Sequence, residues 1–221
     1  MTNLTLIIPA KKEKESLPEV LRELNKFNFK IKIVLKENDL ETINSIKEFN
    51  KEIIYQNGYG YGNALIQGIN ECNTDYYCIF NADKSFNPSE IGQMLEYLNQ
   101  NDLDIIFGSR YQKNSGSEDD TWVTLIGNYF FTYLGKILFS LPISDILYTF
   151  VVGKTEKTKN LNLKQNDFSF CVELPIKAKK GKLKIASYPC YERSRFAGVK
   201  KVNAFKDGFL ILIEMVKLFF K

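Results

Sequence analysis

The sequence predicts an α/β fold, with a doubly wound and mostly parallel sheet flanked by helices. Over residues 1–110, short apolar runs alternate with segments whose apolar residues recur at helical spacing, a pattern typical of parallel sheets. Polar residues follow directly after several of these runs, and ligands bind beyond the carboxyl ends of strands in such sheets. The length of 221 residues fits one domain.

Five buried strands are expected in the first 110 residues. Each is an apolar run of roughly 4–8 residues, and the first is ended by Pro9. The expected strands are 4–10, 31–35, 52–56, 76–80 and 103–110. The helices expected between them are 15–27, 40–49, 63–72 and 89–100.

The pattern changes after Arg110. A polar segment, 111–120, is expected to be a loop, and a long, mostly apolar helix is expected at 122–143. Further along, Asp167 and Gly181 are residue types that begin and end helices. An extended segment, a helix, a strand and a final helix are expected at 143–153, 167–181, 182–192 and 204–221.

The composition excludes several classes of catalytic and metal site. The sequence has no histidine, which excludes Ser-His-Asp catalysis and histidine-ligated zinc. Its four cysteines show no CxxC spacing and are expected to be reduced thiols of a cytosolic protein. The net charge of +4 permits an anionic ligand or a membrane surface but does not require nucleic acid. No signal peptide opens the sequence, and no apolar run reaches the roughly 18–20 residues that span a bilayer.

The segment "IFNADKSFNP", residues 79–88, raises the question of a metal site. Asn81 and Asp83 stand one residue apart after an apolar run. Two carboxylates at this spacing would suit a divalent cation holding a diphosphate, and here one of the two is an amide. Because Mg²⁺ prefers oxygen ligands and keeps several waters, Asp83 together with two phosphate oxygens could suffice. The alternative interpretation is a capped turn between a strand and a helix.

Three glycines precede the helix expected at 63–72. Gly58, Gly60 and Gly62 do not form a dinucleotide fingerprint, because that pattern requires glycine where Asn63 stands. We expect them to allow close backbone approach at the start of the helix. A plain flexible turn is the alternative.

A basic cluster, "ERSRFAGVKKV", occupies residues 192–202. Its cations, Arg193, Arg195, Lys200 and Lys201, stand on both sides of Gly198. A mobile clamp for a phosphate group explains the glycine between two cationic pairs. A solvated charged loop is the alternative.

The C-terminal segment 204–221 has a wide apolar face. On a helical wheel its charged residues gather on one narrow face, and the apolar residues occupy the rest. Such a face must be buried in the protein, in a partner or in a lipid interface, and the same applies to residues 129–143. Core packing and peripheral membrane attachment are both open. Attachment would place the protein in the cytoplasm, at the cytoplasmic face of a membrane.

Seven segments follow one another in a definite order. They are "IIPAKKEKESLPEVL", "GYGNALIQGI", "IFNADKSFNPSEI", "DIIFGSRY", "SDILYTF", "FSFCVELPIKAKKGKL" and "RFAGVKKV". This order resembles family 2 glycosyltransferases with the GT-A fold, most nearly the dolichyl-phosphate mannose synthase-like branch, which transfers sugars to polyprenyl phosphates. The resemblance implies one GT-A domain over 1–221, with a nucleotide-sugar-binding half at 1–110, an acceptor-side half at 111–203 and a C-terminal amphipathic helix at 204–221.

The resemblance also implies roles for individual residues. Asp83, with Asn81 beside it, would hold Mg²⁺ or Mn²⁺, and Arg195 and Lys201 would contact the diphosphate from a loop that closes over the donor. The implied catalytic residues are Asp83, Arg110, Asp145, Glu173, Arg195 and Lys201. The implied nucleotide-binding residues are Pro9, Ala10, Lys12, Glu13, Leu35, Glu37, Gly62, Asn81, Ala82, Asp83, Arg195 and Lys201.

The acceptor decides whether a base is needed. A lipid phosphate is already ionised, whereas a sugar hydroxyl requires a general base. Asp145 and Glu173 are the candidates, and the alternative for each is hydrogen bonding that orders a loop. The polyprenyl-phosphate branch usually carries an arginine shortly after the loop tryptophan, and no arginine stands between Trp122 and Lys136.

The function implied by the resemblance is transfer of a sugar, with inversion and metal assistance, from a nucleotide-diphosphate sugar to a polyprenyl phosphate or a glycan, as in cell-envelope polysaccharide synthesis. A homo-oligomer is compatible with this. Two other classes stay open: a catalytically silent relative that binds a nucleotide or a partner, and a nucleotidyltransferase. The second usually has a glycine-rich loop after the first strand, and "PAKKEKE" contains no glycine.

Overall fold

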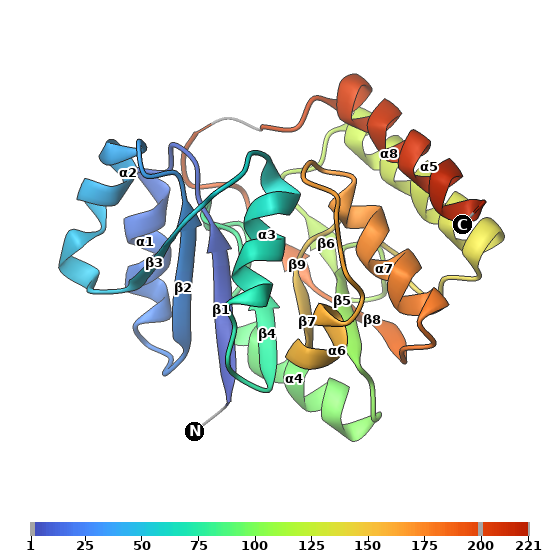
Figure 1. The fold of residues 1–221 in the computed structure, drawn as a ribbon, viewed down its shortest axis with the longest axis horizontal. Helices are drawn as coiled ribbons and strands as arrows, with labels where there is room; N and C mark the ends of the chain where they lie inside the picture. The colour runs from blue at the N-terminus through green and yellow to red at the C-terminus, as the bar shows by residue number, and fades with distance from the viewer. Residues whose placement is uncertain (1–2, 199–200, 221) are drawn as a thin grey trace.

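The fold is built around a central sheet. The computed structural model describes residues 3–198 and 201–220. Lys200 and Lys221 therefore lie outside the described residues. The strand order is β3-β2-β1-β4-β7-β5-β8 (Figure 1). The strands are β1 (Leu4–Pro9), β2 (Lys30–Leu35), β3 (Glu52–Tyr55), β4 (Tyr76–Ile79), β5 (Ile105–Ser109), β7 (Val151–Lys154) and β8 (Ile185–Pro189). Neighbours pair in parallel except β7, which is antiparallel to β4 and β5. The predicted mostly parallel α/β sheet is therefore confirmed.

Helices cover both faces of the sheet because strand side chains alternate between the faces. On β1, Leu6 and Ile8 belong to one apolar core and Ile7 belongs to the other. The first core includes residues of α1 (Ser16–Leu24) and α4 (Ser89–Gln100), with α2 (Leu40–Ser45) at its side. The second core includes residues of α3 (Tyr61–Asn70), α5 (Trp122–Phe139), α7 (Phe170–Lys180) and α8 (Ala204–Phe219).

The helix predicted over 122–143 is shorter than expected. It ends at Phe139, because Ser140 adopts a left-handed backbone with φ 53° and Pro142 cannot continue a helix. The extended segment predicted over 143–153 becomes a strand only at β7. The helix predicted over 40–49 is divided into α2 and a 3₁₀ turn, Lys47–Phe49.

Two elements were not expected from the sequence. The predicted loop 111–120 contains a short strand, β6 (Gly116–Ser117), which pairs in parallel with β9 (Tyr191–Glu192). A short helix, α6 (Thr155–Lys159), follows β7. The β6–β9 pair connects the segment after β5 to the basic cluster, so it bears directly on the site.

The parallel strands place several chain segments on one edge of the sheet. β1, β2, β4 and β5 all end there, at Pro9, Leu35, Ile79 and Ser109. The antiparallel β7 begins there, since Ile79 of β4 is paired with Val151. We call this the carboxyl edge, and the residues predicted to bind a ligand cluster beside it.

Candidate functional site

Asp83 follows β4 at the carboxyl edge. Its Oδ1 accepts hydrogen bonds from the backbone N–H of Ser85 (3.1 Å) and from the Ser85 hydroxyl (2.7 Å). This turn forces Lys84 into the left-handed region, with φ 71°. The other carboxylate oxygen, Oδ2, faces the Arg195 guanidinium at 3.7 Å. The capped turn predicted as an alternative is therefore present, and it leaves Oδ2 directed at a cation.

Asn81 stands two residues before Asp83. Its Oδ1 accepts a hydrogen bond from the Tyr61 hydroxyl at 3.3 Å, and that hydroxyl also lies 2.8 Å from the Thr149 hydroxyl. The Tyr61 ring stacks on Phe168 with centroids 5.1 Å apart. Burial raises the pKa of Tyr61 well above its ordinary value, so this phenol is a hydrogen-bond donor and not a base. Tyr61 is a site residue that the sequence analysis missed.

Residues 193–198 and 201–202 contact residues at the carboxyl edge, and we call these described residues the basic strap. Residues 199 and 200 lie outside the described part of the chain. The Arg195 guanidinium donates to Asp119 at 2.9 Å in addition to facing Asp83. The backbone N–H of Phe196 donates to the Asp83 carbonyl at 2.9 Å. Burial alone would lower the pKa of Arg195, but these carboxylates raise it, so the guanidinium stays charged.

Lys201, farther along the strap, forms an ion pair with Glu13. Glu13 is buried, accepts a hydrogen bond from the Ser16 hydroxyl, and its backbone N–H donates to Thr42 at 3.0 Å. Two cations of the strap thus pair with two carboxylates, Asp83 and Glu13, which follow two different strands, β4 and β1. Four residues predicted to bind the nucleotide sugar or its metal thus form two ion pairs in the structure, Arg195 with Asp83 and Lys201 with Glu13.

The segment after β1 has a strained backbone beside this site. Lys12 lies in the left-handed region at φ 54°, held by a hydrogen bond of 2.7 Å from its N–H to the Asp39 carboxylate. The Lys12 side chain is exposed, as is that of Glu37 after β2. Both side chains are therefore open to a ligand at this end of the sheet. Pro9 is the last residue of β1, and Ala10 follows it directly.

The side chain of Leu35, which was predicted to bind the nucleotide, is not accessible to a ligand in the structure. Its side chain is fully buried, and its carbonyl accepts the Gln56 N–H at 2.8 Å. Ala82 is likewise buried beneath the Asp83 turn. Neither residue presents its side chain to the site, because both side chains are buried.

Gly60 and Gly62 allow a close backbone approach, as expected, but the approaching group is protein. A Cβ atom on Gly62 would lie 2.2 Å from the Gln165 carbonyl oxygen and 2.7 Å from that of Asp167. Gly60 adopts φ 98° and approaches the Asn166 carbonyl in the same way. In the structure Gly62 docks the start of α3 against the 165–167 loop, and its predicted contact with the nucleotide stays a prediction.

Arg110, predicted beside the diphosphate, is instead the centre of an internal network. Its guanidinium donates to Asp145 (2.8 Å from Nε), to Glu192 (3.0 Å) and to Asp120 (3.3 Å). Burial alone would lower the pKa of Arg110, but the charge of Asp145 raises it well above the ordinary value. Burial raises the pKa of Glu192 despite this contact. Arg110 connects the end of β5 to Glu192 of β9, and all three of its guanidinium nitrogens donate to carboxylates. Its predicted contact with the diphosphate stays a prediction.

The two candidate general bases are also engaged in internal hydrogen bonds, and a catalytic role for either stays a prediction. Asp145 is fully buried and accepts hydrogen bonds from Arg110 and Asn128. Glu173 is buried and accepts the backbone N–H groups of Lys164 (2.9 Å) and Gln165 (2.8 Å). Both carboxylates order loops, which was the alternative interpretation of each.

The metal hypothesis depends on Asp83. The described residues contain no group of three or more carboxylate or cysteine side chains placed to hold a metal ion. Mg²⁺ bound through one carboxylate and substrate phosphates does not need such a group. Asp83 Oδ2 and the Asn81 carbonyl oxygen have the chemistry for Mg²⁺ or Mn²⁺, provided that a diphosphate supplies further oxygens and Arg195 shifts away. The residues fit a metal that arrives with its substrate.

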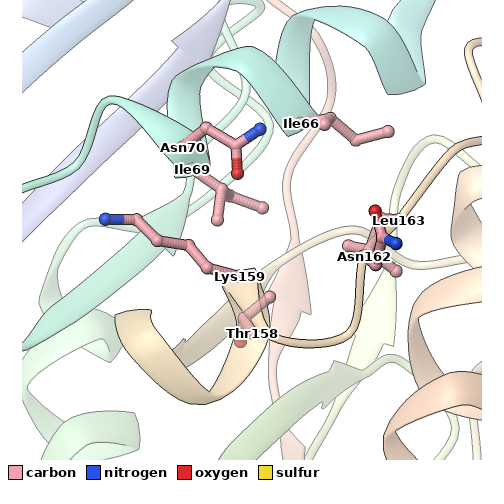
Figure 2. A pocket seen from close by; sticks show the side chains of 7 residues that line it. All are labelled: Ile66, Ile69, Asn70, Thr158, Lys159, Asn162 and Leu163. Atoms are coloured by element: carbon pink, nitrogen blue, oxygen red, sulfur yellow. The ribbon is translucent and has the colours of Figure 1, made fainter.

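A small cavity lies between α3 and the segment around the end of α6 (Figure 2). Its walls come from the C-terminal half of α3, including Ile69 and Asn70, and from residues 158–163 around the end of α6. Tyr61, which touches the site, is at the opposite end of α3. The cavity therefore belongs to the α3–α6 junction and not to the carboxyl edge.

The comparison with known families now decides the classification. Residues 5–161 match the model of glycosyl transferase family 2. The chain belongs to this family. The matched span includes Glu13, Asn81 and Asp83, while the basic strap lies beyond it.

Curated relatives are distant. The chain is 25% identical over 193 residues to a dolichol-phosphate mannosyltransferase of Pyrococcus furiosus, which covers 81% of this chain and 54% of that protein. The chain therefore spans about half the length of that relative. An uncharacterized glycosyltransferase of Mycobacterium bovis is 21% identical over 210 residues, covering 95% of this chain and 94% of its own.

Solved structures show that the fold is GT-A. The glucosyl-3-phosphoglycerate synthase of Mycobacterium tuberculosis, solved with Mn²⁺, UDP and glucosyl-3-phosphoglycerate, superposes with a TM-score of 0.72 at 11% identity, over 97% of this chain and 79% of that one. The mannosyl-3-phosphoglycerate synthase of Rubrobacter xylanophilus superposes with a TM-score of 0.71 at 12% identity, over 97% and 72%. At these identities the likeness concerns the fold alone.

Proposed function

We propose that this family 2 glycosyltransferase transfers a sugar from a nucleotide-diphosphate sugar, with Mg²⁺ or Mn²⁺ assistance, to a polyprenyl phosphate or a glycan. The observation that carries the proposal is the meeting of Arg195 and Lys201 with Asp83 and Glu13 at the carboxyl edge. In transfer from such a donor, the departing group is a diphosphate whose negative charge grows. Cations placed there stabilise that charge.

On binding, the diphosphate of the donor would replace the carboxylates as the partner of Arg195 and Lys201. Arg195 and Lys201 are now neutralised by carboxylates, and a diphosphate offers them a stronger anionic partner. Their release would leave Asp83 Oδ2 free to hold the metal on the donor. The solved relative with Mn²⁺ and UDP supports a metal and a uridine nucleotide as the first choices to test.

A lipid-phosphate acceptor agrees with the internal placement of the two candidate bases. Asp145 and Glu173 are buried and occupied, so neither is positioned to deprotonate a hydroxyl. A phosphate acceptor is already ionised and needs no base. The dolichol-phosphate mannosyltransferase of Pyrococcus furiosus supports this acceptor class. We also propose that the enzyme works at a membrane face, with the C-terminal helix as a contact.

Thermal-shift screening against UDP-, GDP-, CDP- and dTDP-sugars, each with and without Mn²⁺, tests the donor. A ligand at 100 times its dissociation constant stabilises a protein by about 2.7 kcal/mol, which gives a readable rise in Tm. The proposal predicts a metal-dependent rise with one nucleotide that Asp83→Ala abolishes and Asp102→Ala, an exposed control on the opposite edge of the sheet, retains. If none of the nucleotide sugars raised the Tm, that result would contradict the proposal. Binding without release of nucleoside diphosphate, in the presence of polyprenyl phosphate or glycan acceptors, would indicate the catalytically silent alternative.

A further inference from the structure

Helices α5 and α8 carry an exposed apolar surface that the donor site does not use. The helices lie side by side (Figure 1), and the rings of Phe139 and Phe219 meet edge to face with centroids 6.1 Å apart. Nineteen large apolar side chains are exposed in the described residues, of which seven lie on α5 and five within 205–220. We define the α5–α8 surface by its most prominent members, Trp122, Ile126, Tyr133, Phe205, Phe209 and Phe220.

This surface is separate from the faces that pack in the core. The exposed members on α8 and just after it recur after 4 and 11 residues, which at 3.6 residues per turn places them on one side of the helix. The core side is formed by other residues, Ile211 and Met215. Trp122 is 79% exposed and Phe205 is 85% exposed. Folding therefore buries one face of 204–220 and leaves a second apolar face in contact with solvent.

The charges around the surface are positive. Lys136, Lys206 and Lys217 are all exposed on the same two helices. Asp207 accepts the Asn203 backbone N–H at 2.7 Å as part of the helix cap, and Glu214 is buried. The sequence of α5 contains no acidic residue. A lysine-rimmed face of Trp, Tyr and Phe has the charge complementary to anionic headgroups and the residue types of a membrane interface.

We infer that the α5–α8 surface docks onto a lipid bilayer that carries anionic headgroups. The described helices include none that is long and apolar enough to cross a membrane, so the contact lies in the interface. Both helices begin beside the donor site: Trp122 follows the Asp119 partner of Arg195, and Phe205 follows Lys201. Docking would therefore hold the carboxyl edge near the bilayer surface. This inference deepens the membrane contact proposed above for the C-terminal helix, and its consequence, access to a lipid acceptor, rests on the proposed function.

Trp122 makes the inference directly measurable, because it is the single tryptophan of the chain. The 221-residue chain is mixed with vesicles of phosphatidylglycerol and phosphatidylcholine in equal parts, or of phosphatidylcholine alone. We expect a blue shift of tryptophan emission and co-sedimentation with the anionic vesicles. Phe205→Ser combined with Phe209→Ser should weaken this binding at least about tenfold, given the contribution of buried apolar area. Leu40→Ser combined with Tyr55→Ser, both exposed on other elements, should leave it unchanged.

Charge reversal tests the lipid specificity. Lys206→Glu with Lys217→Glu should lower anionic-vesicle binding by about tenfold or more, whereas Lys26→Glu with Lys47→Glu, exposed on the opposite part of the fold, should have little effect. Three results would overturn the inference: no binding to either vesicle, binding that ignores both surface variants, or self-association that the same variants abolish, which would assign the surface to a second copy. Donor-dependent thermal shifts measured on the same variants separate failure of docking from failure of the proposed function.

Discussion

Replacing Gly62 with alanine is predicted to destabilise the protein, although alanine normally favours helices. A Cβ atom there would lie 2.2 Å from one backbone carbonyl oxygen and 2.7 Å from another, both in the 165–167 loop. These oxygens cannot move by a side-chain rotation, and the loop is fixed by hydrogen bonds from Lys164 and Gln165 to Glu173. Overpacking costs typically 1–3 kcal/mol, and the rigid neighbours place this site at the upper end.

Gly92, the fourth residue of α4, is the matched control. No atom lies within 4 Å of a Cβ built there. Gly92→Ala should therefore stabilise the protein by about 0.5–1 kcal/mol through helix propensity alone. At roughly 2–4 °C per kcal/mol for a chain of this size, calorimetry should show Gly62→Ala lower in Tm by about 5–10 °C and Gly92→Ala higher by about 1–4 °C. Equal Tm values for the two variants would refute the assignment of Gly62 to loop docking.

Two further predictions concern buried charges. Arg110→Met should destabilise the protein by about 3–5 kcal/mol, because it leaves the buried Asp145 without its counter-charge; chemical denaturation measures this, and a change below about 1 kcal/mol would mean that the network is dispensable. Burial alone would raise the pKa of Asp104, but the Lys184 N–H and the Lys154 ammonium lower it overall. The carboxylate therefore contributes stability above its ordinary pKa, near 4, and loses it as pH falls through the lowered value. Asp104→Asn should reduce Tm at pH 7, and the difference from the parent should shrink in acid; a difference that grew in acid would reverse the sign of this argument.

The sheet could be predicted from local sequence because each strand is a short apolar run. The positions of Asp83 and Glu13 followed from the same pattern, since residues after parallel strands gather at one edge. The insertion of β7 between β4 and β5 could not be predicted, because it depends on pairing between segments far apart in the chain. The end of α5 at Ser140 depends on one left-handed residue inside an otherwise helical pattern.

The partners of the charged residues could not be predicted from the sequence either, because these partners lie in other segments of the chain. Arg110 meets Glu192, which is 82 residues away, and Glu173 meets the backbone of a loop that showed no signal of its own. A residue that matches a motif position can therefore be placed in the fold from the sequence. The sequence does not tell whether its hydrogen-bonding groups are free. The pairing of Arg195 with Asp119 could have been suspected from the acidic pair Asp119-Asp120 in a polar segment.

The central claim is that Asp83 and the basic strap hold the diphosphate of a nucleotide sugar. Isothermal titration calorimetry with the best nucleotide sugar from the thermal-shift screen, in the presence of Mn²⁺, tests it on the parent, Asp83→Ala, Arg195→Ala and the control Asp102→Ala. The account predicts at least a tenfold loss of affinity for the first two variants, since charge-assisted contacts contribute about 1.5–3 kcal/mol each, and parent-like affinity for the control. Parent-like affinity in Asp83→Ala and Arg195→Ala would contradict it.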